Sequence, residues 1–215
     1  MVSDLNERLA ALKGKHLERN DEIDPNGRVY INKLTGEVFH SVTRILSATM
    51  AEENKKALEK WLERPDSLQT RDMAAARGTA AHSSAEYVLK TAQRLARATA
   101  KKRNSWRVGE DGLHRAPKAV TKWALEKAIQ GCPRVPWSAS GYARGLRGWI
   151  LDHVTAIHSV EFSAHHPAGF AGACDALLDL DGEGPFIVDW KTSGKSIHKS
   201  MESQLVNYRD QTGAY

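Results

Sequence analysis

The sequence has 215 residues, of which 41% are hydrophobic and 27% are charged, and its formal net charge is +5. These values are ordinary for a globular protein, and the length suits one domain with a sizeable core. No apolar run is long enough to cross a bilayer, and the charged N-terminal stretch has no signal-peptide core, so we expect a cytoplasmic protein. Cys132 and Cys174 are too few for a four-cysteine zinc site or an iron–sulfur cluster.

Helices are expected over most of the first 155 residues. Apolar periodicity and a composition rich in Ala and Leu indicate them. Ser47 and Thr49 are typical N-caps, so one helix is expected to begin there and to stop near Pro65. The expected helices cover residues 1–22, 47–65, 67–100, 117–130, 138–155 and, after the last strand, 195–215.

Strands are expected in two places. Two short strands should flank a turn at residues 34–36. A three-stranded meander should follow the helices, with two strands in residues 156–180 around a loop at 165–168 and a third at 186–192. We therefore expect one structural domain of three segments. The segments are an N-terminal helix, hairpin and helix (1–66), a helical segment with a basic insertion (67–155), and the meander with its final helix (156–215).

The strand at FIVDWKT ends in two opposite charges, Asp189 and Lys191. Successive side chains of a strand point to opposite faces, so these two share one face and Trp190 takes the other. D-x-K is common at strand ends, where it forms a surface ion pair. The same arrangement is also typical of a catalytic site, so other motifs must decide between the two interpretations.

Asp175 is expected beside this pair of charges. The strands are joined by a tight turn near Glu183, and residues equidistant from the turn pair, so Asp175 should fall opposite or diagonal to Asp189. Neighbouring carboxylates repel and favour a cation between them, and Asp and water oxygens are ligands that Mg²⁺ or Mn²⁺ prefer. Such an ion lowers the pKa of water and polarises a phosphodiester, and Lys191 can then stabilise developing negative charge.

Three further motifs accompany these charges. GFAGACD places glycines before Asp175, which allows close approach of backbone or ligand. RGTAAHSSAEYVL puts His82 and Glu86 on one helical face, and QLVNY puts Gln204 and Tyr208 four residues apart on another. A lone histidine on an apolar helix is more often packed in a core. The order G-T-x-x-H, G-x-x-D, D-x-K and Q-x-x-x-Y is far more specific than any single motif.

With these motifs the chain resembles the PD-(D/E)xK nuclease superfamily, in its RecB-like branch, and especially phage exonucleases related to the mitochondrial genome maintenance exonuclease. The resemblance includes HSVTRILSAT and ALEKWLE and runs from about Tyr30 to Tyr208. It implies an α/β (α+β) fold, with a restriction-endonuclease-like core in which helices flank a small mixed or antiparallel sheet, and here a mainly helical N-terminal half. The family core continues with another strand after the Q-x-x-x-Y helix, so we expect a different closure or a fragment lacking that strand.

The resemblance also implies roles for the matching residues. Asp175 and Asp189 would hold the metal, Mg²⁺ or Mn²⁺, and Lys191 would be the catalytic lysine. His82 would join the catalytic set as a neighbour of the metal or a contact to phosphate.

Three other residues are expected to support this site. Gln204 and Tyr208 would support the site and the DNA, as the Q-x-x-x-Y pair does in the family. Glu161 lies on the strand before the glycine turn, where relatives often carry a glutamate. It is expected to be a metal ligand or a support for the ligands, with a purely structural role as the alternative.

Basic residues are concentrated between Lys90 and Arg147. The segment is either a solvated helical surface or a phosphate-binding face. We expect Lys101, Lys102 and Arg103 to contact DNA. Three acidic residues oppose fourteen basic ones, which are Lys90, Arg94, Arg97, Lys101, Lys102, Arg103, Arg107, Arg115, Lys118, Lys122, Lys127, Arg134, Arg144 and Arg147.

These observations together predict a metal-dependent deoxyribonuclease, in particular an exonuclease of phage or mobile-element origin. Its partners would be DNA, single-stranded or with free ends, and the recombination or replication machinery of a phage. The alternatives are a sequence-nonspecific endonuclease and a catalytically silent DNA-binding module of the same fold. No phosphate-binding G-x-x-x-x-G-K-[ST] loop is present, so the sequence does not imply ATP.

Overall fold

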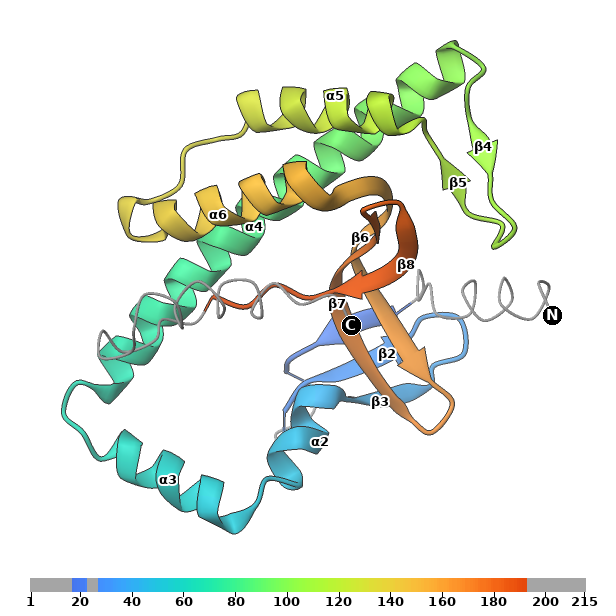
Figure 1. Ribbon diagram of the computed structural model, residues 1–215. Helices are drawn as coiled ribbons and strands as arrows, with labels where there is room; N and C mark the ends of the chain where they lie inside the picture. The colour runs from blue at the N-terminus through green and yellow to red at the C-terminus, as the bar shows by residue number, and fades with distance from the viewer. Residues whose placement is uncertain (1–16, 23–26, 193–215) are drawn as a thin grey trace. The chain divides into compact units, whose positions relative to one another are not determined.

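The computed structural model describes residues 17–22 and 27–192 (Figure 1). The chain forms two compact units. The first contains the described residues up to Arg71 together with Phe162–Cys174, and the second contains Asp72–Glu161 together with the described residues from Asp175 onward.

The first unit is built on short strands. Val29 and Tyr30 of β2 are buried, as is Phe39 of β3, and Tyr30 and Phe39 form a small core with Ala171. β1 and β2 are antiparallel, β2 and β3 are antiparallel, and β3 runs parallel to the first part of β7. The strands are β1 (Leu17–Asn20), β2 (Val29–Asn32), β3 (Val38–Ser41) and β7 (Phe170–Leu180).

The expected hairpin around residues 34–36 is confirmed, but the helix expected over residues 1–22 is wrong at its C-terminal end. Leu17–Asn20 is the strand β1, which pairs along its whole length with β2. This pairing is non-local, and the backbone hydrogen bonds that it supplies outweigh the helical spacing of the leucines. The rest of the expected helix lies outside the described residues.

Two short helices follow β3, where the sequence predicts one. α2 (Val42–Ala48) begins at Ser41, whose side chain accepts a hydrogen bond from the backbone N–H of Arg44. Thr49 is therefore the C-cap of α2 and not an N-cap, and Ser47 lies inside the helix, where its hydroxyl donates to the carbonyl of Thr43. α3 (Glu52–Leu62) then ends before Pro65, as predicted.

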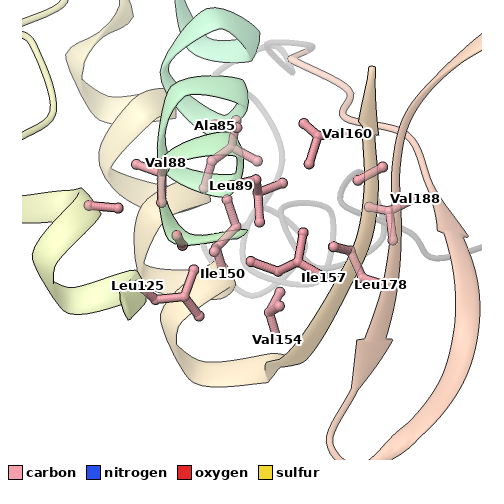
Figure 2. Close-up of a cluster of buried hydrophobic side chains, with 14 of the residues drawn as sticks. Ala85, Val88, Leu89, Leu125, Ile150, Val154, Ile157, Val160, Leu178 and Val188 are labelled. Carbon is pink, nitrogen blue, oxygen red and sulfur yellow. The ribbon is translucent and has the colours of Figure 1, made fainter. Parts of the chain in front are cut away.

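Helices dominate the second unit, and the three long helices predicted there are confirmed. The helix α4 has 36 residues and is the longest element of the described chain. One face of it packs through small and branched residues against the other helices and the strands (Figure 2). The helices are α4 (Ser67–Lys102), α5 (Lys118–Gln130), a 3-10 turn (Trp137–Ala139) and α6 (Ser140–His153).

The hydrophobic core of the second unit lies between these helices and three strand segments. Figure 2 shows Leu89 of α4, Ile150 of α6 and Leu178 of β7 in this core, with Ile157 between Ile150 and Leu178. Leu89, Ile150 and Leu178 are fully buried. At about 25 cal/mol per Å² of apolar surface, each such side chain contributes roughly 2 kcal/mol relative to an exposed one, which fixes the strands against α4.

The predicted meander is present as β6 (Val154–His166), β7 and β8 (Glu183–Val188). Besides its neighbour β6, β7 pairs with two strands on successive parts of its length, β3 in the first unit and β8 in the second. The strand order is β1-β2-β3-β7-β6, with β8 pairing to β7. The fold is therefore a mixed α/β fold, as predicted.

One further hairpin was not predicted. β4 (Arg107–Val108) and β5 (His114–Arg115) pair within the stretch expected to be a loop. None of the helices in the described residues is long and apolar enough to span a membrane.

Candidate active site

The register of the β7–β8 hairpin brings Asp175 and Asp189 together. Ala176 pairs with Val188, and both side chains are fully buried against the helices. Asp175 and Asp189 are the neighbours of this pair, one on each chain segment. Because side chains alternate along a strand, those of Asp175 and Asp189 project from the opposite face. The backbone N–H of Trp190 donates to Oδ2 of Asp175 over 2.6 Å, which fixes the carboxylate at the strand end.

Lys191 completes the D-x-K motif on the same side. Its Nζ forms an ion pair with Oδ2 of Asp189. The side chain of Lys191 is 59% exposed, whereas that of Asp189 is 31% exposed. The ammonium group is therefore open to a molecule arriving from solvent, while the carboxylate is held closer to the protein.

His82 of α4 lies beside Asp175. Its Nδ1 is 3.5 Å from Oδ1 of Asp175. The hydrogen bond to Asp175 raises the pKa of His82, burial lowers it, and the charges of Asp175 and Asp189 raise it further, so the net shift is upward. Burial raises the pKa of Asp175, but the hydrogen bonds from His82 and from the Trp190 backbone outweigh it and lower this pKa overall.

Glu161 reaches the same group from β6. Its backbone adopts a positive φ of 50° within β6, which is strained for a non-glycine residue. Burial, followed by repulsion from Asp175 and Glu86, raises the pKa of Glu161. Glu86 itself pairs with Lys90 one helical turn along α4, at 2.5 Å.

The carboxylates in this group outnumber the fixed positive charges. Two lysine ammonium groups, of Lys90 and Lys191, oppose four carboxylates, which favours an additional cation. No set of three or more His, Cys, Asp or Glu side chains in the described residues is arranged to hold a metal ion. Mg²⁺ is usually bound through one or two carboxylates together with water and substrate phosphates, so the Asp175–Asp189 pair fits such an ion.

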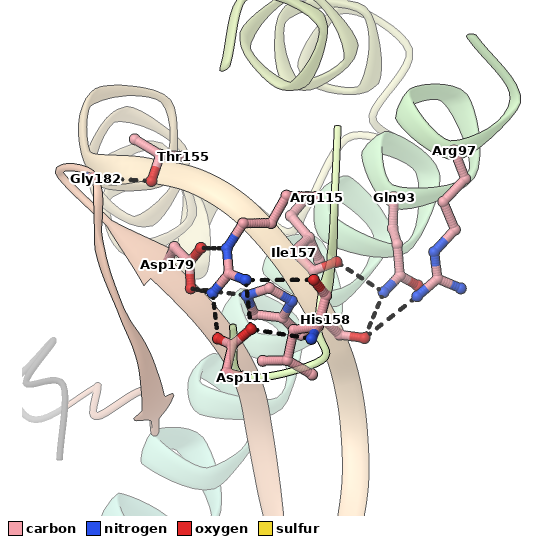
Figure 3. A network of polar contacts seen from close by, with 10 residues as sticks. Gln93, Arg97, Asp111, Arg115, Thr155, Ile157, His158, Asp179 and Gly182 are labelled. Atoms are coloured by element: carbon pink, nitrogen blue, oxygen red, sulfur yellow. Dashed lines mark hydrogen bonds and ion pairs between the residues drawn. The ribbon is translucent and has the colours of Figure 1, made fainter. Parts of the chain in front are cut away.

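Asp179 lies four residues after Asp175 on β7 and differs from it, because both oxygens of the Asp179 carboxylate have partners within the protein. Its Oδ1 is 2.7 Å from Nε2 of His158, and its Oδ2 accepts from Nε of Arg115 over 2.6 Å (Figure 3). Burial raises the pKa of Asp179, but these two partners outweigh it and lower the pKa. Asp175, by contrast, is held by one backbone N–H and lies beside His82, so it is the β7 carboxylate that can take part in a site.

Gly78 of α4 has no side chain, and this leaves room for the segment that carries Lys191 to lie against the helix. A Cβ atom at Gly78 would lie 2.9 Å from Oγ1 of Thr192, closer than such atoms normally approach. Thr192 directly follows Lys191 in the chain. The glycine of the ARGTAAH motif therefore permits a close approach between this helix and the segment that carries Lys191.

Gly78→Ala is expected to lower the DNA cleavage that the sequence predicts roughly ten- to hundredfold, because displacing Thr192 moves Lys191 from its position. The free energy of unfolding should change by less than about 1 kcal/mol, since alanine favours the helix and offsets the crowding. Gly145→Ala in α6 is the matched control, because its Cβ would meet no atom within 4 Å. Equal cleavage rates for the two variants would contradict this role of Gly78.

The remaining predicted residues are not part of this cluster. Lys101, Lys102 and Arg103 are exposed at the C-terminal end of α4. Gln204 and Tyr208 lie outside the described residues. Sequence reasoning missed the backbone bond from Trp190, which no side-chain pattern reveals, and Lys90, which its i, i+4 spacing from Glu86 could have indicated.

Comparison with known proteins gives a match to one family. The model of the PD-(D/E)XK nuclease superfamily matches residues 15–215. No match was found among curated proteins or among solved structures. The match agrees with the predicted restriction-endonuclease-like core. Because it covers nearly the whole sequence, the chain belongs to the PD-(D/E)XK nuclease superfamily.

Proposed function

We propose that the protein is a metal-dependent DNA exonuclease whose active site consists of Asp175, Asp189, Lys191 and His82. The observation that carries this proposal is the convergence of His82 from α4 and two aspartates from adjacent strands, with the exposed Lys191 ammonium beside them. Nucleases of this superfamily cleave nucleic acids and use divalent metals, generally Mg²⁺ or Mn²⁺.

Asp175 and Asp189 would hold the ion, which supplies activation of water and polarisation of the phosphodiester. Asp175 is suited to this role because the Trp190 backbone and His82 keep its carboxylate ionised. Hydrogen bonds of this kind also fix its direction at the strand end, so little reorganisation is needed when substrate binds.

Lys191 would act on the scissile phosphate. Its Nζ is fixed by Asp189 and exposed to solvent, so it can approach both a phosphate oxygen and the attacking oxygen. A positive charge held there stabilises the negative charge that develops as the phosphorus–oxygen bonds form and break. His82, whose pKa is raised by its hydrogen bond to Asp175, lies beside that carboxylate and can donate a hydrogen bond to phosphate.

Glu161 would complete the site from β6. Partial burial of its carboxyl group, followed by repulsion from Asp175 and Glu86, raises its pKa, and an added cation would relieve that repulsion. We therefore assign it to the surroundings of the ion. The preference for free DNA ends is supported by the resemblance to RecB-like exonucleases.

The basic segment would supply attraction to the DNA backbone. Replacing Lys101, Lys102 and Arg103 together with glutamine should weaken binding and reduce the slope of log K against log salt by about 2 to 3, since each phosphate contact contributes about 0.7 to 0.9. Turnover at saturating DNA should stay near the wild-type value because none of the three lies at the cleavage site. A binding titration over a range of salt concentrations measures the affinity and its salt dependence. An unchanged slope would show that these three residues do not contact the DNA.

The proposal is tested by incubating the protein with end-labelled linear DNA and with covalently closed circles, single-stranded and double-stranded, in Mg²⁺, in Mn²⁺ and in EDTA. An exonuclease degrades only the linear substrates and requires the metal. Cleavage of circles would establish the endonuclease instead. If the wild type cleaves no substrate and binds DNA as tightly as Asp175→Asn does, the protein is a DNA-binding module and the proposal is overturned.

A further inference from the structure

A cavity of about 580 Å³ opens at the far end of α4 from the ARGTAAH motif. It lies where the last turn of α4 meets the first turns of α5, and both segments belong to the second unit. Its volume is within the range of pockets that bind small ligands. The lining residues are Thr99, Lys102, Arg103, Ala119, Val120 and Trp123.

The lining combines an aromatic wall with two cations. Trp123 is a large side chain that remains 41% exposed, so its indole ring can be reached from solvent. Lys102 and Arg103 are exposed and form no ion pair with the described part of the chain. The lining contains no carboxylate. A flat ring beside unpaired cations is the combination that binds a base together with its phosphate.

The cavity lies at a fixed distance from the candidate active site because one helix connects them. Twenty residues separate His82 from Lys102 on α4. At a rise of 1.5 Å per residue this separation is about 30 Å. A stacked nucleic-acid strand rises about 3.4 Å per nucleotide, so about nine nucleotides span it.

We propose that this cavity is an anchoring subsite for single-stranded DNA, in which one unpaired base stacks on Trp123 and its phosphate binds Lys102 and Arg103. The inference rests on the proposed nuclease function and adds a second contact about nine nucleotides from the cleaved bond. Single-stranded DNA is favoured over duplex because a base must leave its own stack to lie on an indole ring. Ala119 and Val120 supply the apolar floor beneath such a base.

The test measures the binding of fluorescently labelled oligonucleotides by anisotropy, in EDTA so that no cleavage occurs. A single strand and a duplex, each of about twenty nucleotides, both exceed the nine-nucleotide span. Trp123→Ala should weaken binding of the single strand roughly tenfold and leave the duplex nearly unchanged, because only an unpaired base can stack on the ring. Trp123→Phe, which keeps an aromatic ring, should recover most of the loss. Trp137→Ala is the matched control, because Trp137 is 91% exposed and lies outside the cavity.

The outcomes separate this inference from the proposed function. No effect of Trp123→Ala on the single strand, or an effect on the duplex as large as that on the single strand, would overturn the subsite. Thermal unfolding of each variant distinguishes loss of binding from loss of structure, and the phenylalanine variant tests the subsite if the alanine variant unfolds. A failure of the wild-type protein to cleave any DNA would overturn the nuclease proposal alone, since the binding measurement requires no turnover.

Discussion

Replacing Lys191 by alanine is expected to lower the cleavage rate by at least 10²- to 10³-fold while DNA binding stays close to that of the wild type. The ammonium group is fixed by Asp189 and lies where charge would develop on the phosphate, and the loss of one such preorganised group typically costs this much in other enzymes. Binding persists because ground-state attraction to phosphates is spread over many basic residues, of which Lys191 is one.

Single-turnover cleavage of labelled linear DNA and a separate binding titration distinguish the two effects. Lys60→Ala is the matched control, because Lys60 is an exposed lysine near the end of α3. It should leave both quantities unchanged. Wild-type turnover of Lys191→Ala in Mg²⁺ would contradict the nuclease proposal and favour the DNA-binding module.

The local features of the site were predictable because strand geometry is periodic. An apolar run, a tight turn and a second apolar run define a hairpin, and alternation then fixes which side chains share a face. The structure pairs Ala176 with Val188, which places Asp175 and Asp189 as the next residues on the opposite face. The long helix α4 was equally predictable, since its composition and apolar spacing extend over many turns.

Features that depend on distant partners were not predictable in the same way. Leu17–Asn20 becomes a strand through pairing with β2, although the sequence pattern predicts that a helix extends to residue 22. Ser41 is the N-cap of α2, so this helix begins before Ser47 and Thr49. Those two residues are also common N-caps. Propensity identifies all three as N-caps, and only the packing of the preceding strand decides among them.

The distinction between Asp175 and Asp179 also lies beyond sequence reasoning. Strand alternation assigns both aspartates to the same face of β7, so the sequence pattern does not distinguish them. Asp179 is neutralised by His158 and by Arg115, which is 64 residues away in the chain. Asp175 instead receives one backbone N–H and the nearby imidazole of His82, and so retains capacity for another cation. Only the fold shows which carboxylate is available for chemistry.

Arg115→Ala is expected to destabilise the protein by about 3 kcal/mol at neutral pH. The guanidinium forms paired hydrogen bonds to Asp179 and to Asp111, with Nη2 to Asp111 Oδ2 at 2.6 Å and Nη1 to Oδ1 at 2.8 Å. Its removal leaves the Asp179 side chain, only 8% exposed, with His158 alone, and breaking a buried pair on one side typically costs 3–5 kcal/mol. We take the lower end because Arg115 is 25% exposed.

Urea unfolding measures this difference, with Arg107→Ala as the matched control. Arg107 is an exposed arginine directly opposite Arg115 in the same two-stranded hairpin, and it should contribute little. Arg115→Lys should fall between the wild type and Arg115→Ala, because an ammonium group keeps the charge but cannot bridge two carboxylates with a planar fork.

The difference should also depend on pH in a defined direction. The hydrogen bonds from Arg115, which outweigh the effect of burial, lower the pKa of Asp111 from 3.8 to about 2. A carboxyl group with a lower pKa in the folded state contributes stability that is complete above its unfolded value and is lost as the pH falls through the folded value. The gap between wild type and Arg115→Ala should therefore be constant from neutral pH down to about 4 and should shrink between about 4 and 2. A gap that stays constant across that window, or widens in it, would show that the Arg115 network does not stabilise the fold through these carboxylates.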